Sequence, residues 1–141
     1  MEVKSIKSLV LKFGISYILI LLVLGVFMNI LGITLKSSAI TIILIFFLLR
    51  FFLKKYIHNT ETELSKHDFI KIFFGAYLFV LSYDLFTLAI AILSKNLSIS
   101  QSSLITVITF AIIINAAVII LTIYQTNKSI KKNLLAVKQD S

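Results

Sequence analysis

The sequence predicts an all-α polytopic membrane protein in which four transmembrane helices form an antiparallel bundle. Three observations support this fold class: 59% of the 141 residues are hydrophobic, only 14% are charged, and the chain contains four long apolar segments. A water-soluble domain has about 25% charged residues. Apolar residues also occur on every face of each predicted helix instead of forming one stripe, as expected of helices buried in lipid. We therefore expect one integral membrane domain over residues 1–141.

The four segments have the length of membrane spans, because a helix needs roughly 20 mostly apolar residues to cross the hydrocarbon. The expected helices cover about 13–35, 38–56, 68–94 and 103–125, followed by a basic tail over 126–141. The first segment runs for 23 uncharged residues between Lys12 and Lys36. A signal peptide has only about 7–15 apolar residues and a small-residue cleavage site, so we expect this helix to be retained.

The third helix has a recognisable start. Ser65 and Asp68 fit the Asp variant of the capping box, and Thr60 and Glu63 fit the capping box itself. The first pair directly precedes an apolar run. The third helix is therefore expected to begin near Lys66, before the chain enters the membrane.

Basic residues are concentrated at alternate ends of the predicted helices. Twelve of the 14 Lys and Arg residues lie in the N-terminal tail, the central connection with its borders, and the C-terminal tail, whereas the other two connections carry only Lys36 and Lys95. The positive-inside rule then places both termini in the cytoplasm of a bacterium, with the chain in its inner membrane. This placement accounts for the net charge of +8 without a nucleic-acid partner.

The sequence offers no constellation for catalysis. The chain has no Cys, which excludes disulfides, thiolate metal sites and Cys nucleophiles. No phosphate-binding glycine loop, hydrolase elbow or zinc-protease motif occurs. His58, His67, Glu61, Glu63 and Asp68 do not have zinc-site spacing and are interpreted as a solvated loop. We predict no enzyme activity and no catalytic, cofactor or metal site.

Asp84 is the one acidic residue inside an apolar span, close to the bilayer midplane. An ionisable group there costs at least about 2.5 kcal/mol, which makes it a functional candidate. Asn115 lies at the centre of the next helix, so a short connection brings both side chains to one depth. We expect the two to meet, either to fix helix packing or as part of a proton-titrating site. Tyr77 and Thr87 share the face of Asp84 by helical spacing.

Two basic features leave alternatives open. Arg50, near the cytoplasmic end of the second helix, either extends to the lipid headgroups or forms a salt bridge with Asp84 if helix tilt closes the depth difference. The tail over 126–141 mixes apolar and Lys residues. It either lies on the anionic inner leaflet as a short interfacial helix or is a frayed end.

The run Ser65-Lys66-His67-Asp68 followed by Gly75 resembles a family of uncharacterised small four-helix bacterial inner-membrane proteins. That resemblance implies a four-helix membrane protein and no activity. In size and layout the chain is also similar to the immunity proteins of pore-forming bacteriocins, which are short, lysine-rich and multi-pass. Small multidrug-resistance transporters share the four-helix layout, but their essential glutamate lies in helix one, where this chain has no carboxylate.

Two functions follow as expectations. The first is a non-enzymatic interaction protein, such as an immunity protein against a membrane-active toxin, whose partners are the lipid bilayer and a protein toxin or other membrane partner. The alternative is a small proton-coupled transporter or channel subunit that uses Asp84. Such a transporter would need to form a homodimer to enclose a pathway. Neither function involves a cofactor or nucleic acid.

Overall fold

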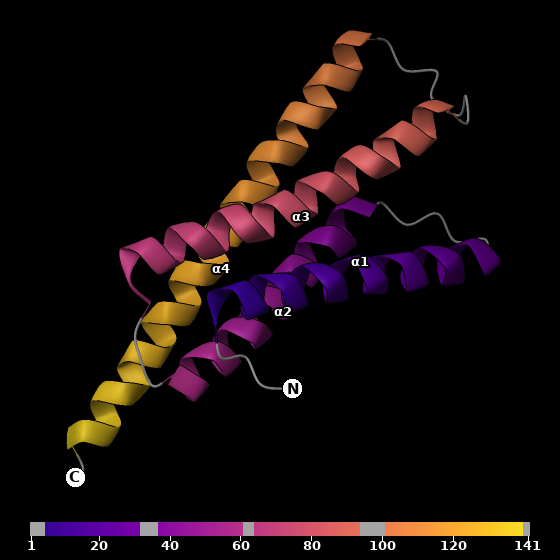
Figure 1. Cartoon of the computed structure of the whole chain (residues 1–141). Coiled ribbons are helices and arrows are strands. Elements are labelled where there is room, and N and C mark those ends of the chain that lie inside the picture. Colours follow the sequence, from indigo (N-terminus) through magenta and orange to yellow (C-terminus); the bar gives the residue numbers. More distant parts are fainter. Residues whose placement is uncertain (1–4, 32–36, 61–63, 94–100, 140–141) are drawn as a thin grey trace.

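The computed structural model describes residues 5–31, 37–60, 64–93 and 101–139. These residues form four α-helices: α1 (Ile6–Ile30), α2 (Ser37–Thr60), α3 (Lys66–Leu93) and α4 (Gln101–Gln139) (Figure 1). Three contain a stretch long and apolar enough to cross a membrane, namely Ile6–Met28, Lys66–Ile90 and Ile108–Ile130. The remaining helix, α2, carries Arg50, Lys54 and Lys55 in its second half. The all-helical fold is therefore confirmed, with three helices that are long and apolar enough to cross a membrane.

Consecutive helices run antiparallel, and the bundle closes as a ring (Figure 1). The main contacts of α1 are with α2 and α3, and those of α4 are also with α2 and α3. The order around the bundle is therefore α1, α2, α4, α3, which puts α1 and α4 on one diagonal and α2 and α3 on the other. Every helix can thus contribute side chains to one shared interior.

Side-chain caps fix where α1 and α3 begin. The Ser5 hydroxyl accepts a hydrogen bond from the Ser8 amide at 3.2 Å, and α1 starts directly after it, well before the expected position 13. At α3 the Ser65 hydroxyl accepts from the Asp68 amide at 3.1 Å, and the Asp68 carboxylate accepts from the Ser65 amide at 3.4 Å. This reciprocal pair is the predicted capping box, and α3 begins at Lys66.

The other predicted capping box does not start a helix at Thr60. Thr60 is the last residue of α2, and its hydroxyl donates to the Tyr56 carbonyl at 2.9 Å. Glu63, its expected partner, lies outside the described residues.

The C-terminal tail continues α4 without a break. The helix has 39 residues and ends at Gln139, so 126–139 is neither a separate short helix nor an irregular end. At 1.5 Å per residue α4 is about 58 Å long. That is almost twice the ~30 Å of bilayer hydrocarbon, so the end of α4 extends beyond the other helices (Figure 1).

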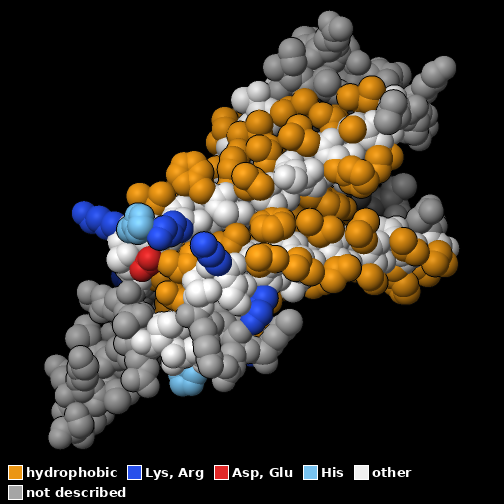
Figure 2. Space-filling model, in the orientation of Figure 1, with side chains coloured by type: hydrophobic (Ala, Val, Ile, Leu, Met, Phe, Trp, Pro, Cys, Tyr) orange, Lys and Arg blue, Asp and Glu red, His pale blue; other side chains and the backbone are white. Residues whose placement is uncertain are grey.

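The hydrophobic core occupies only one half of the bundle. Among the described residues, none is buried after Leu21 in α1, before Thr41 in α2, after Val80 in α3 or before Asn115 in α4. The described basic side chains lie at the same end as the core, and apolar side chains predominate over the rest of the described surface on the visible face (Figure 2). We call this end the inner half. The outer half comprises 22–30, 39–40, 85–93 and 101–114.

Close contact between α1 and α3 depends on two glycines. A Cβ atom added at Gly14 of α1 would run into the ring of Phe79 from α3. A Cβ atom at Gly75 of α3 would come within 2.6 Å of Val10 from α1. Each helix therefore offers a glycine to a bulky side chain of the other, which lets the two backbones approach closely.

Candidate functional site

Asp84 and Asn115 meet between α3 and α4, as the sequence predicts. The Asn115 side-chain amide Nδ2 donates a hydrogen bond to Asp84 Oδ2 at 2.7 Å. Asn115 is only 6% exposed, whereas Asp84 is partly buried. The contact satisfies two polar groups that would each be costly to leave unpaired in hydrocarbon.

Tyr17 brings α1 to the same site. Its side chain is fully buried, and its ring stacks on Phe13 at a centroid distance of 5.8 Å and meets the Tyr83 ring edge-on at 5.9 Å. The Tyr17 hydroxyl is close enough to interact electrostatically with Asp84 and lies next to Thr41 of α2. Within the described part of the chain the hydroxyl oxygen makes no hydrogen bond of good geometry, although the Thr41 side chain is close enough to interact with it.

All four helices therefore contribute to one polar layer. We define it by these residues: Tyr17, Thr41, Tyr83, Asp84 and Asn115. Thr41, like Asn115, is buried, with 8% of its surface exposed. Because burial ends at this level in every helix, the polar layer is the last layer of the core. Polar contacts shared by four helices fix their relative depth, since a shift of any one helix would separate them.

The other candidate residues lie away from this layer. The Arg50 guanidinium lies 5.6 Å from the centre of the Phe46 ring, a cation–π contact within α2. The salt bridge between Arg50 and Asp84 does not occur in the described part of the chain. The reason is that Arg50 is directed along its own helix. Tyr77 stacks on Phe73 at 5.7 Å.

Thr87 is exposed, and its hydroxyl donates to the backbone carbonyl of Asp84 at 2.9 Å. Further hydroxyls are satisfied in the same way by their own helices. Ser82 donates to the Leu78 carbonyl and Thr122 to the Val118 carbonyl, both at 2.7 Å. Such bonds remove the cost of a hydroxyl in lipid without offering it to a ligand.

The sequence indicated that Tyr17 either lies at the membrane interface or makes a contact between helices, but it did not reveal the contributions of Thr41 and Tyr83. A carboxyl and an amide in an apolar run are conspicuous because they are costly there, whereas phenols and hydroxyls are common in membrane helices. The signal that could have found them is one polar side chain at a similar depth in every span. Helix tilt blurs that depth when it is counted from the nearest Lys residue.

The described residues contain no group of three or more His, Cys, Asp or Glu side chains that could hold a metal ion. Glu61 and Glu63 lie outside them. No family model, curated protein or solved structure matches the chain. A functional assignment therefore has to come from the geometry of the polar layer and the outer half.

Proposed function

We propose that the chain is a small non-enzymatic protein of the bacterial inner membrane that acts by binding another protein within the bilayer. Its most specific form is an immunity protein against a membrane-active toxin. In this proposal all four helices, α2 included, span the membrane, and both termini lie in the cytoplasm.

The observation that carries the proposal is the one-sided core. Every membrane protein exposes apolar side chains to lipid, so exposure alone identifies no partner. Here none of the described residues beyond the polar layer is buried, and the outer ends of α3 and α4 diverge from those of α1 and α2 (Figure 1). Exposed apolar residues include Val23, Phe27, Phe86, Ile90 and Phe110. Apolar side chains that the bundle itself leaves exposed suit the recognition of a hydrophobic protein segment inside the membrane.

The orientation has its own test. With the basic inner half in the cytoplasm, green fluorescent protein fused after Ser141 should fluoresce, and alkaline phosphatase fused there should be inactive. Alkaline phosphatase fused after Lys36 should be active, because that connection would face the periplasm. An active phosphatase after Ser141 with a dark fluorescent fusion would contradict the orientation.

The immunity function predicts protection of living cells. Cells that express the chain should keep their membrane potential when exposed to the toxin encoded beside its gene, whereas cells with an empty vector should lose it. A potential-sensitive dye reports the difference within minutes. Full loss of potential in cells whose membranes demonstrably contain the chain would contradict the proposal.

Asp84 favours a second candidate, a small proton-coupled transporter or channel subunit that works as a homodimer. A carboxyl near the midplane that bonds to Asn115 of α4 and lies close to Tyr17 of α1 is the group such a protein would titrate. Asp84→Asn keeps the size of the side chain and removes the titratable group. Protection from the toxin should survive this substitution. Proton-driven uptake or a proton leak in liposomes that the substitution abolishes would instead favour the transporter.

A further inference from the structure

Arg50 interrupts an apolar surface of α2. Ile43, Phe47 and Phe51 on this surface are exposed, and Arg50 is half-buried. Lys54 is exposed and follows Arg50 by four residues, so helical spacing puts the two on the same side of α2, with Lys54 one turn closer to the inner end. We call these five residues the α2 face.

The guanidinium of Arg50 has an aromatic partner instead of an acidic one. It lies 5.6 Å from the centre of the Phe46 ring, and among the described residues no carboxylate pairs with it. Asp84 is bonded to Asn115 instead, and α2 contains no acidic residue. Because Phe46 precedes Arg50 by one turn on the outer side, the contact holds the charge away from the inner end of the helix. A guanidinium without a counter-charge is costly in hydrocarbon.

An anionic phospholipid would supply the missing counter-charge. Guanidinium binds phosphate oxygens in a bidentate geometry, and the ammonium of Lys54 adds a second positive charge one turn away. The anionic headgroups of the cytoplasmic leaflet lie at the membrane border, next to Lys54. This position favours them over a carboxylate that a partner helix would have to bring.

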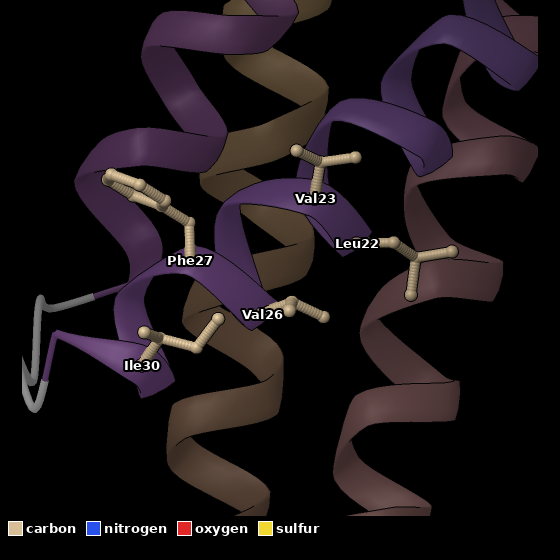
Figure 3. Close-up of a pocket in the computed structure, with 5 residues that line it drawn as sticks. All are labelled: Leu22, Val23, Val26, Phe27 and Ile30. Atoms are coloured by element: carbon tan, nitrogen blue, oxygen red, sulfur yellow. The ribbon is translucent and has the colours of Figure 1, made fainter.

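The α2 face also suits the acyl chains of such a lipid. Ile43 and Phe47 continue outward from Arg50, so groups that bind phosphate are followed by apolar side chains, in the order of headgroup and chains within one leaflet. A shallow hollow on α1 lacks this order, because it is lined by apolar side chains only (Figure 3). Its lining residues are Leu22, Val23, Val26, Phe27 and Ile30. That hollow can hold acyl chains but cannot select a headgroup.

We propose that the α2 face binds an anionic phospholipid of the cytoplasmic leaflet, with its phosphate on Arg50 and Lys54 and its acyl chains along Phe47 and Ile43. The bound phosphate neutralises Arg50 and so lowers the cost of placing α2 in the bilayer. The inference rests on the part of the proposed function in which α2 spans the membrane with its basic end in the cytoplasm.

Native mass spectrometry of the purified protein in detergent measures the affinity for single lipids. The probes are dioleoyl phosphatidylglycerol and dioleoyl phosphatidylcholine, which have the same acyl chains but differ in net charge. The protein should bind phosphatidylglycerol about tenfold more tightly, the difference expected from one charge-assisted contact. Arg50→Gln should remove most of this preference. Arg50→Lys should keep part of it, because lysine retains the charge without the bidentate geometry.

The third helix, α3, provides a matched control for an exposed lysine without the arginine. Lys71 of α3 is exposed and lies seven residues from Leu78, which is 64% exposed. On α2 the same spacing separates Lys54 from Phe47, which is also 64% exposed. At the position that corresponds to Arg50, however, α3 has a glycine. Lys71→Gln removes one charge from the inner half and should leave the preference for phosphatidylglycerol unchanged.

Photolabelling locates the bound lipid. Phosphatidylglycerol with a diazirine in its acyl chains, added at limiting concentration in detergent, should label the α2 segment around Phe47 in preference to the α3 segment around Leu78. Peptide mass spectrometry reads both segments in the same molecule. The comparison needs no variant, so it tests the proposal even if Arg50→Gln fails to fold. In a folded Arg50→Gln protein the preference for α2 should disappear.

Three results would overturn the inference. Equal affinity for the two lipids, or equal labelling of the two segments, would mean that lipid covers α2 without a specific site. Equal losses in Arg50→Gln and Lys71→Gln would mean that binding follows the total charge of the inner half. An unchanged preference in Arg50→Gln would leave the guanidinium to a carboxylate of a partner helix.

The outcome can be separated from that of the proposed function. Active alkaline phosphatase after Lys36 without lipid selectivity would overturn this inference alone. Inactive phosphatase at that position would overturn the orientation on which the inference rests. Lipid selectivity without protection from the toxin would overturn only the toxin assignment.

Discussion

Gly14→Ala should destabilise the protein by about 1–3 kcal/mol, the usual cost of overfilling a packed interface. The added methyl group would overlap the Phe79 ring, which lies directly on the glycine. Phe79 cannot move aside without losing its place between α1 and α3, so the two helices must separate. Titration of the purified protein with denaturing detergent, followed by circular dichroism, would measure the loss.

Gly25 provides a matched control in the same helix. A Cβ atom there would meet nothing within 4 Å. Gly25→Ala should therefore leave stability unchanged or raise it by up to about 1 kcal/mol through better helix propensity. Gly75→Ala should resemble Gly14→Ala, because its Cβ would crowd Val10. Equal effects of Gly14→Ala and Gly25→Ala would show that α1 and α3 do not pack as described.

Asn115→Leu should cost about 1–2 kcal/mol, the value of a strong polar contact between membrane helices. Leucine branches at Cγ as asparagine does, although it is larger, and it suits an apolar surrounding, so the shape of the contact is largely kept. The loss arises because Asp84 keeps a carboxyl group whose donor has gone. The same detergent titration measures this change.

The double variant Asp84→Leu/Asn115→Leu gives a sharper result. Replacing both members of a buried polar pair by apolar groups can be nearly neutral, so the double variant should regain most of the stability lost in Asn115→Leu. Such a recovery would show that Asp84 and Asn115 are energetically coupled, because the effects of two independent sites would simply add. If the two single effects simply add, the contact between α3 and α4 does not stabilise the fold.

The sequence predicted the features that depend on the free-energy cost of a polar group in hydrocarbon or on hydrogen bonds within one helical turn. Asp84 and Asn115 were identified because a carboxyl and an amide are expensive in hydrocarbon, and a short connection places them at one depth. The start of α3 was identified because Ser65 and Asp68 bond each other's backbone amides within one turn. Neither inference requires knowledge of how the helices pack.

The one-sided core could not be predicted in this way. In a soluble protein, a polar stripe marks the face of a helix that does not pack. A membrane helix is apolar all round, so a residue such as Leu21, which is buried, and one such as Val23, which is exposed, look alike in sequence. The predicted start of the first helix at about residue 13 is also wrong, because Ser5 caps α1 ahead of both Lys7 and Lys12.

The polar layer separates the residues that hold the helices together from those that remain open to the bilayer. Substitutions at positions such as Val26 or Ile90 alter the exposed surface of the outer half but remove no buried side chain from the core. The outer half is therefore free to diversify. Under the proposed function, a change of binding preference in the outer half would leave the inner scaffold and its stability intact.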